Sequence, residues 1–343
     1  MKYLQIGKSD IMGSVVALGT LSMSGMHYGQ SDDAESVRTI HKARELGVNI
    51  LDTARRYGFG KSESIIAAAI KGRRHEYILS TKGGLVWNGE EGSFIEVSGG
   101  KNVYRNLSPE IMRRQCEESL RTLGTDYLDI YFTHWQSVEP YFTPISETMG
   151  ELCKLKQEGK IRAIGVSNVT PEHVREYQKY GEVDIIQQKY SLLAPSEAEV
   201  IWPLCEEYNI TFEPYSFLEI GLLTGKIGME YQVNDGDVRG RFAWYEPARR
   251  KMLLDVFDGW ASYCKKYACD IVNLVIAMTL QQHPRMTVLC GSRKVSQIED
   301  CVRGAELELD EADVVCMQRD FDNLLAEEAK MPPCESAPRR HQL

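Results

Sequence analysis

The chain has 343 residues, of which 43% are hydrophobic, and a formal net charge of −9 at pH 7. This length supports one large core, and the acidic balance argues against nucleic-acid binding through bulk charge. No apolar run reaches the length that spans a membrane, and the start MKYLQIGKSD lacks the apolar centre of a signal peptide, so we expect a cytoplasmic protein with neither nucleic-acid nor membrane partners.

Strand-like runs alternate with helical patterns, which predicts an α/β fold of the (β/α)8 TIM-barrel type. The expected barrel strands are residues 15–19, 48–51, 77–82, 127–134, 161–165, 183–186, 210–214 and 287–290. The expected helices are residues 33–46, 63–71, 108–123, 144–158, 171–180, 247–267, 271–282 and 309–329. We expect one domain over residues 1–330 with extra peripheral helices, an N-terminal β-hairpin that closes the barrel bottom, and a flexible tail over residues 331–343.

A polar stretch follows the second expected strand. Asp52 would close that strand and Tyr57 would lie in the loop after it, where Gly58 and Gly60 let the backbone turn before Ser62 caps the next helix. A carboxylate and a phenol would therefore share one rim of the barrel. The alternative is an ordinary loop with a capping aspartate and a packed tyrosine.

The next strands carry complementary chemistry at their ends, because one ends in Lys82 and another in His134. A parallel barrel delivers catalytic side chains at the carboxyl ends of its strands. We therefore expect Asp52, Tyr57, Lys82 and His134 to meet on one rim. A lone histidine is usually structural, and His134 becomes a catalytic candidate through these neighbours.

Residues 83–106 are rich in glycine and show no strong periodicity, which predicts an irregular binding loop on the rim. Its large aromatic residue, Trp87, is a candidate wall of the substrate pocket, and an anchoring role in the loop is the alternative. Trp135, directly after the histidine, and Tyr28, in the first rim loop, are two further candidate walls.

Seven motifs occur in one order along the chain: Leu51-Asp-Thr-Ala-x-x-Tyr-Gly-x-Gly-x-Ser-Glu63, Ser80-Thr-Lys82, residues 119–131 with His134, residues 159–168, Gln187-x-x-Tyr190-Ser-Leu-Leu193, residues 221–226, and Gly291-x-Arg293-x-x-x-Gln297. Together they resemble the aldo-keto reductase superfamily, most closely the longer bacterial members related to potassium-channel β subunits. The resemblance spans roughly residues 1–325.

The resemblance implies an enzyme that reduces an aldehyde or ketone with NADPH. Tyr57 would donate the proton to the carbonyl oxygen of the substrate, a small molecule. Because an unperturbed tyrosine has a pKa of about 10, a charged Lys82 aimed by Asp52 would stabilise the phenolate. His134 would orient and polarise the carbonyl. No Gly-x-Gly-x-x-Gly follows a strand, which argues against a Rossmann dehydrogenase.

The implied cofactor-binding residues are Ser167, Asn168, Gln187, Tyr215, Gly221, Lys226, Gly291, Arg293 and Gln297. The first three would hold the nicotinamide carboxamide, and Tyr215 would stack on the ring. Capping or turn formation is the alternative for Ser167 and Asn168. Arg293 would grip a 2′-phosphate at a helix start, where free backbone N–H groups also favour a phosphate.

The chain departs from the family pattern in two places. Phe217 and Glu219 replace the usual proline and glycine after the stacking tyrosine, and Cys301 replaces an asparagine, which puts one adenine contact in doubt. The polar insert 227–246 resembles the belt that closes over the cofactor in this family, and Lys226 before it could pair with a phosphate.

Two other functions stay open. One is a nucleotide-binding regulatory subunit of the kind this fold provides to potassium channels, and the other is an alcohol or sugar dehydrogenase. No added docking segment is visible, which favours an enzyme. The nine cysteines form no Cys-x-x-Cys pair and the seven histidines no close-spaced ligand motif, so we expect reduced thiols and no metal site. The sequence leaves the substrate and the oligomeric state unspecified.

Overall fold

Eight parallel strands form the centre of the computed structural model, which describes residues 1–26, 29–89, 91–234 and 237–334. The strands are β3 (Val16–Gly19), β4 (Ile50–Asp52), β5 (Ile78–Gly83), β9 (Leu128–Thr133), β10 (Ile161–Ser167), β11 (Ile185–Lys189), β12 (Thr211–Tyr215) and β13 (Val288–Gly291). They pair in the order β12-β11-β10-β9-β5-β4-β3-β13. Phe212 closes the ring, because its N–H donates to Arg285 O at 2.9 Å and its carbonyl accepts from Thr287 N at 3.0 Å. The predicted (β/α)8 barrel is confirmed.

Apolar side chains from the barrel strands and from the turn of the N-terminal hairpin fill the hairpin end of the barrel. The buried residues of this cluster are Ile6, Ile11, Ala17, Ile50, Ile78, Ile130, Phe132, Ala163 and Ile185. Gly165 is required beside Phe132, because a Cβ at this position would lie 2.4 Å from the phenyl ring. Close packing of this kind makes the barrel a filled core and leaves its rim for chemistry.

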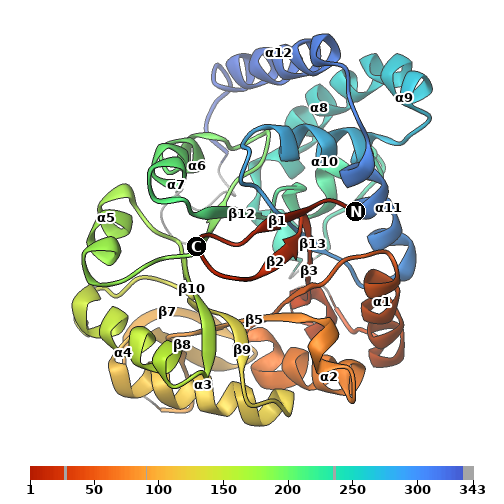
Figure 1. The fold of residues 1–343 in the computed structure, drawn as a ribbon. Coiled ribbons are helices and arrows are strands. Elements are labelled where there is room, and N and C mark those ends of the chain that lie inside the picture. The colour runs from red at the N-terminus through yellow and green to blue at the C-terminus, as the bar shows by residue number, and fades with distance from the viewer. Residues whose placement is uncertain (27–28, 90, 235–236, 335–343) are drawn as a thin grey trace.

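The predicted N-terminal hairpin is present and closes one end of the barrel. Strands β1 (Tyr3–Gln5) and β2 (Met12–Ser14) pair antiparallel and cross the front of the barrel in Figure 1. The turn between them is bound to the barrel wall, since the N–H of Gly7 donates to Thr211 Oγ1 at 2.9 Å. The carboxyl ends of the strands therefore form the other, open rim.

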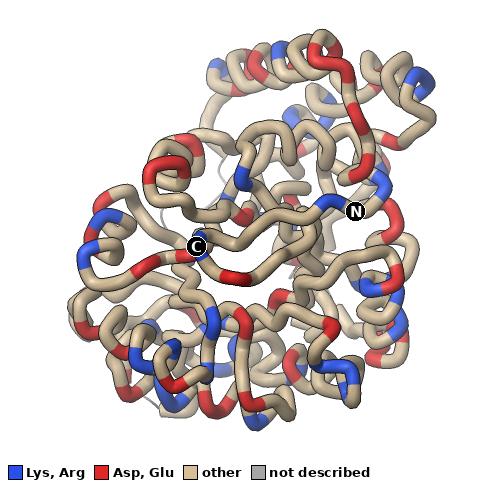
Figure 2. Tube along the Cα trace, viewed as in Figure 1, with Lys and Arg blue, Asp and Glu red and all other residues tan. Residues whose placement is uncertain are grey.

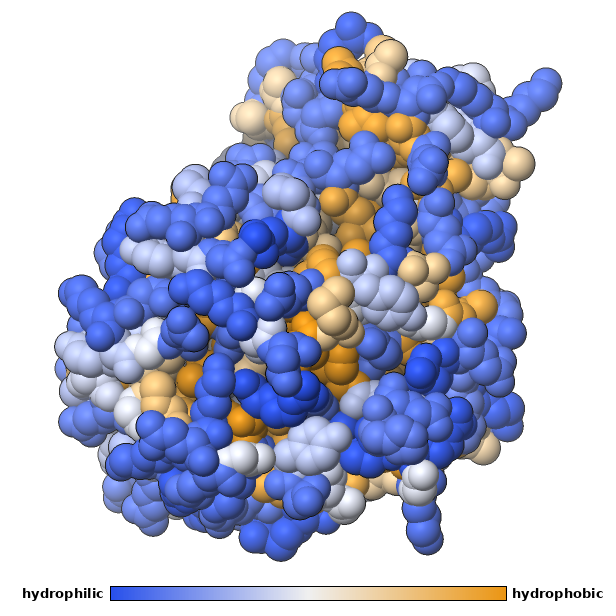
Figure 3. Space-filling view, in the orientation of Figure 1, coloured by the Kyte–Doolittle hydropathy of each residue, from blue (hydrophilic) through white to orange (hydrophobic). Residues whose placement is uncertain are grey.

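Helices surround the barrel on its outer side (Figure 1). They are α1 (Asp33–Glu45), α2 (Lys61–Ile70), α3 (Pro109–Leu123), α4 (Ile145–Gln157), α5 (Pro171–Tyr180), α6 (Ser196–Glu199), α7 (Trp202–Tyr208), α8 (Pro247–Gly259), α9 (Ala261–Tyr267), α10 (Ile271–Gln281), α11 (Val295–Glu306) and α12 (Glu311–Glu328). Ser108 caps α3 by accepting from Ile111 N at 3.4 Å. Acidic and basic residues alternate over these helices, as Figure 2 shows, and hydrophilic residues dominate the face seen in Figure 3.

Three helix predictions need correction. The helix expected over residues 247–267 is two helices, because α8 ends at Gly259, a poor helix former, and the buried Trp260 follows it. Ser62 does not cap α2, which begins one residue before it; its hydroxyl lies 2.6 Å from Thr20 Oγ1. The short helices α6 and α7 were not expected, since neither is long enough to show a clear helical period.

The segment expected to be irregular forms a small antiparallel sheet. Its strands are β6 (Leu85–Val86), β7 (Ser93–Ser98) and β8 (Lys101–Arg105), in the order β6-β8-β7. Gly99 and Gly100 connect β7 to β8 and both have positive φ, 56° and 73°. Two such residues suit a two-residue hairpin turn, so the glycine pair is the signal that predicts this sheet.

A second core lies outside the barrel, under the helices at the top of Figure 1. Its buried residues are Leu192, Leu193, Leu222, Leu223, Tyr245, Leu253, Phe257, Trp260, Leu274, Val275, Met278, Met317, Phe321 and Leu324. Beyond α12, Pro332 O accepts from Arg249 Nη2 at 2.7 Å, and residues 335–343 of the predicted tail lie outside the described chain. None of the helices in the described residues is long and apolar enough to cross a membrane.

Candidate active site

Lys82 and Asp52 form a buried ion pair at the carboxyl ends of β5 and β4. The ammonium lies 2.7 Å from both carboxylate oxygens and donates to Thr53 O at 2.8 Å. Burial acts to lower the pKa of Lys82, but the negative charges of Asp52 and of the Tyr57 phenolate outweigh it, so the pKa is raised. Both side chains are at most 2% exposed, and the lysine therefore keeps its proton at neutral pH.

Tyr57 lies above this pair in the loop between β4 and α2. Lys82 Nζ is 5.1 Å from the centroid of its ring, and the His134 ring is 5.9 Å away at an interplanar angle of 80°. The loop turns sharply here, because Gly58 and Phe59 have φ values of 61° and 53°. A Cβ at Gly58 would lie 2.9 Å from Lys61 Cβ, so the turn needs glycine at this position.

His134 follows β9 and completes the group of four. Its backbone N–H donates to Gly83 O at 2.9 Å, which fixes the residue against β5. Burial lowers the pKa of the imidazole well below its ordinary value, and the cations Lys82 and Arg56 add to this shift. The ring is therefore neutral at pH 7 and can offer one N–H donor. The structure brings together all four predicted catalytic residues.

Ser167, Asn168 and Tyr215 form a second polar group on the same rim. Asn168 Nδ2 donates to His134 O at 2.9 Å and to Ser167 Oγ at 3.1 Å, and its Oδ1 accepts from Tyr215 OH at 2.6 Å. Asn168 has a φ of 57°, a conformation that asparagine tolerates better than most residues. Asn168 can therefore form the turn and also lie beside the four predicted catalytic residues.

Gln187 connects the ion pair to a carboxyl group that the sequence analysis did not single out. Its Nε2 donates to Asp52 Oδ2 at 2.8 Å and also to Glu213 Oε2. Glu213 lies on β12 and is 1% exposed. The sequence pattern does indicate its position, because every second residue of a strand points to the same face and Glu213 therefore shares a face with Thr211 and Tyr215.

The predicted phosphate-binding residues gather around the start of α11. Gln297 Oε1 accepts from the N–H groups of Arg293 at 2.8 Å and Lys294 at 3.2 Å, and Glu35 Oε1 accepts from Val295 N at 3.4 Å. Side chains of the protein therefore already accept from three of the backbone N–H groups at this helix start. A phosphate that bound these three groups would compete with Gln297 and Glu35 for them.

Three further predicted cofactor residues lie near this helix start or on the loop that faces it. Lys226 forms an ion pair with α11, because its Nζ lies 2.6 Å from Asp300 Oδ2. Gly221 has a φ of 97° in the loop after β12, and Gly291 is the exposed last residue of β13. Lys226 and Asp300 therefore connect the loop after β12 to α11.

The loop after β12 keeps its sharp turn without the usual glycine. Glu219 and Ile220 have φ values of 46° and 55°. Hydrogen bonds from the polar insert hold this backbone, because Tyr245 OH donates to Ile220 O at 3.0 Å and Arg239 Nε does so at 3.3 Å. The Glu219 carboxyl is buried against Ser191 Oγ and is not a surface for polar substrate recognition.

The three candidate substrate walls differ in position. Trp87 is buried and packs edge-on against Phe59, 5.2 Å between centroids, so it supports the loop that carries Tyr57. Trp135 is partly exposed, with the guanidinium of Arg105 4.7 Å above its ring. Tyr28 lies outside the described residues. The anchoring alternative fits Trp87, and Trp135 keeps its place beside His134.

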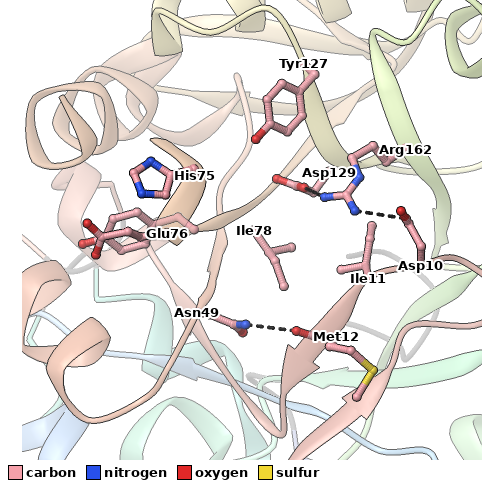
Figure 4. A pocket seen from close by; sticks show the side chains of 11 residues that line it. Asp10, Ile11, Met12, Asn49, His75, Glu76, Ile78, Tyr127, Asp129 and Arg162 are labelled. Carbon is pink, nitrogen blue, oxygen red and sulfur yellow. Dashed lines mark hydrogen bonds and ion pairs between the residues drawn. The ribbon is translucent and has the colours of Figure 1, made fainter. Parts of the chain in front are cut away.

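A polar cavity of about 150 Å³ lies at the opposite end of the barrel (Figure 4). Asp129 and Arg162 line it, and Asp129 lies 2.5 Å from Arg162 and 2.7 Å from Arg74, while Arg162 also lies 3.0 Å from Asp10. These charges neutralise one another across the base of the barrel. Within the described ranges, no group of three or more His, Cys, Asp or Glu residues could hold a metal ion.

The fold is a (β/α)8 barrel, and Asp52, Lys82, Tyr57 and His134 lie together at the carboxyl ends of its strands. Residues 15–319 match the sequence profile of the Aldo/keto reductase family. The chain belongs to this family, whose members are oxidoreductases that use a nicotinamide cofactor.

Individual relatives support this assignment. The chain is 40% identical over 321 residues to the NADH-specific methylglyoxal reductase of Escherichia coli (strain K12), covering 93% of this chain and 98% of the relative. Its structure is similar to that of the glycerol dehydrogenase of Gluconobacter oxydans, with a TM-score of 0.84, 31% identity, and coverage of 97% and 98%. An aldo-keto reductase of Bacillus halodurans, in its holo form, gives a TM-score of 0.75 at 25% identity, with coverage of 100% and 99%.

Proposed function

We propose that this protein is an NADPH-dependent reductase of short aldehydes or ketones, with Tyr57 as the proton donor. The observation that carries the proposal is the Lys82 ammonium, which Asp52 clamps at 2.7 Å and which lies 5.1 Å from the Tyr57 ring. A cation held at this place favours the phenolate and so lowers the free energy needed to release the phenol proton.

The residues on the rim suit a nicotinamide cofactor, which when bound supplies hydride to the carbonyl carbon. Gln187 donates both hydrogens of its amide nitrogen to carboxyl groups, so its Oε1 is left as an acceptor for a carboxamide. Ser167 contributes a hydroxyl beside it, and Tyr215 contributes a ring at the end of β12. Arg293 at the start of α11 supports the preference for the 2′-phosphate of NADPH.

Each of the four side chains then has a separate task. His134, as a neutral imidazole, orients the substrate by donating a hydrogen bond to the carbonyl oxygen. Tyr57 gives its proton to that oxygen as negative charge develops there. Lys82 stabilises the resulting phenolate, and Asp52 is a positioning residue that keeps the ammonium charged and aimed.

The relatives suggest the size of the substrate. One is named for methylglyoxal and one for glycerol, both three-carbon compounds with adjacent oxygen functions. We therefore propose a short, polar carbonyl substrate of the α-oxoaldehyde or hydroxyaldehyde class. The glycerol dehydrogenase also favours a second function, oxidation of a small alcohol by the same residues in the reverse direction.

The test measures oxidation of NADPH and of NADH by the purified protein with methylglyoxal, glyceraldehyde and an aromatic aldehyde. We expect turnover with the two short compounds, a lower KM for NADPH than for NADH, and slower turnover with the aromatic aldehyde. Equal or better use of NADH, the cofactor in the name of the Escherichia coli relative, would overturn the assignment of Arg293. Absence of turnover with all three compounds, and of NADP+ or NAD+ reduction with glycerol, would overturn the proposed enzyme.

A further inference from the structure

Glu213 is a second buried carboxyl group beneath the Asp52–Lys82 pair. The residue is 1% exposed, and its Oε2 accepts from Gln187 Nε2. Its other oxygen, Oε1, is buried and has no hydrogen-bond partner in the described part of the chain. Both oxygens of a buried carboxylate normally accept hydrogen bonds. A buried carboxyl group with a partner on only one oxygen is therefore unusual and points to a functional role.

Every titratable group around Glu213 belongs to a different strand. Asp52 on β4 is an anion, Lys82 on β5 is a cation, and Cys290 on β13 is a buried thiol whose pKa lies well above its ordinary value because of burial. Burial is also the largest cause that raises the pKa of Glu213, to about 8, with a further rise from Asp52 and opposing effects from Gln187 and Lys82. Near neutral pH, Glu213 is therefore the member of this set whose charge changes.

Glu213 also fixes the orientation of Gln187. The amide nitrogen has two hydrogens, and these go to Asp52 Oδ2 at 2.8 Å and to Glu213 Oε2. With both hydrogens directed into the barrel, Oε1 is an acceptor for an NH2 group on the rim. Gln187 is thus held as an acceptor by two carboxyl groups, that of Glu213 on the neighbouring strand β12 and that of Asp52 on β4.

We propose that Glu213 is a positioning residue that holds Gln187 as an acceptor for the nicotinamide carboxamide, and that its ionisation favours the oxidised cofactor over the reduced one. The inference rests on the proposed function. The oxidised nicotinamide ring carries a positive charge and the reduced ring carries none. An anion in the same buried network therefore stabilises the oxidised form, and the effect is strong because the barrel interior has a low dielectric constant.

The test measures the dissociation constants of NADP+ and NADPH between pH 6 and pH 9 by quenching of protein fluorescence. We expect the ratio of the NADP+ constant to the NADPH constant to fall by roughly tenfold as Glu213 loses its proton. The 2′-phosphate, whose second pKa is about 6, also titrates, but it is common to both cofactors and cancels in the ratio.

Two substitutions of Glu213 separate the effect of its negative charge from its effect on the orientation of Gln187. Glu213→Gln keeps an oxygen that accepts from Gln187 but cannot ionise, so the ratio should become independent of pH. Glu213→Met removes both properties and should also weaken binding of both cofactors. Glu63→Gln is the matched control, because Glu63 is likewise buried but accepts from Thr81 Oγ1 at 2.9 Å, away from Gln187; it should keep the wild-type pH dependence.

A flat ratio in the wild type would overturn the inference, as would a Glu213→Gln variant that keeps the wild-type dependence. Failure of the wild type to bind either cofactor would instead overturn the proposed function, and the inference with it. Thermal unfolding of each variant checks that the barrel is folded, so a loss of binding in Glu213→Met can be assigned to the site.

Discussion

The ring of Tyr57 meets the imidazole of His134 edge-on, with the centroids 5.9 Å apart and the planes at 80°. Lys82 approaches the same phenol ring from the barrel interior. A cation on one side and a neutral donor on the other define where a carbonyl oxygen would accept the proton.

Tyr57→Phe should fold like the wild type and lose most of its activity. The substitution removes only the hydroxyl, and general acid catalysis typically contributes about 10² to 10⁴ in rate. We expect kcat to fall by at least about 100-fold at saturating cofactor, with cofactor binding nearly unchanged. Tyr180→Phe, at an exposed tyrosine on α5, is the control. Retention of most of the activity would place the acid elsewhere.

Asp52→Asn should destabilise the protein because it leaves the Lys82 ammonium buried without its counter-charge. Removing one partner of a buried pair typically costs about 3–5 kcal/mol in the free energy of unfolding. The double variant with Lys82→Met should recover much of that loss but none of the activity. Urea unfolding of Asp52→Asn, of Lys82→Met and of the double variant measures the coupling, and strict additivity of the two single losses would contradict a direct interaction.

His134→Gln should change how stability depends on pH. The imidazole has a lowered pKa in the folded protein, so below the unfolded value of about 6.5 the unfolded chain binds a proton that the folded chain does not. Stability is therefore lost as the pH falls from about 6.5 towards the folded pKa, by up to roughly 1.4 kcal/mol per pH unit for this residue. The variant should lose less stability between pH 7 and pH 5, measured by urea unfolding. An identical loss would mean that His134 binds its proton over the same pH range in the folded and the unfolded chain.

Arg293→Ala should weaken NADPH binding more than NADH binding. A hydrogen bond to a charged group is worth about 1.5–3 kcal/mol, so the NADPH dissociation constant should rise roughly 10-fold to 100-fold. Lys294→Ala is the matched control, since it removes the same charge one residue further along the helix start. Equal effects of the two substitutions on NADPH would indicate general electrostatic attraction in place of a specific contact.

The barrel and much of its rim could be predicted because both follow from local patterns. Asp52, Lys82 and Gln187 each end or follow an apolar run, and parallel strands bring such positions to one rim. Glu213 ends no apolar run, and although the period of two places it on the same face as Tyr215, its importance depends on Gln187 on the neighbouring strand and on Asp52 on β4. Gln297 shows the same limit, since only the folded chain reveals that its side chain occupies the N–H groups of Arg293 and Lys294.

Other errors had a local cause. The sheet formed by β6, β7 and β8 was predicted as an irregular loop because its strands are short and their exposed residues include hydrophobic ones such as Phe94 and Val97. The Gly99-Gly100 pair, which suits a two-residue hairpin turn, indicates that two strands flank it. Ser62 was assigned as a cap because serine often caps helices, but its hydroxyl is used to bind Thr20 and Thr53 under the Tyr57 loop.

The hairpin that closes the barrel also sets an order of events during synthesis. Gly7 binds Thr211, 204 residues later, and the amino group of Met1 lies 2.6 Å from Glu306 Oε1. Ile6 and Ile11, the first apolar residues of the barrel bottom to leave the ribosome, therefore have no finished barrel to enter until β13, the last barrel strand, has been translated. Such distant contacts form slowly, so pulsed hydrogen exchange during refolding should find the hairpin among the last segments to become protected.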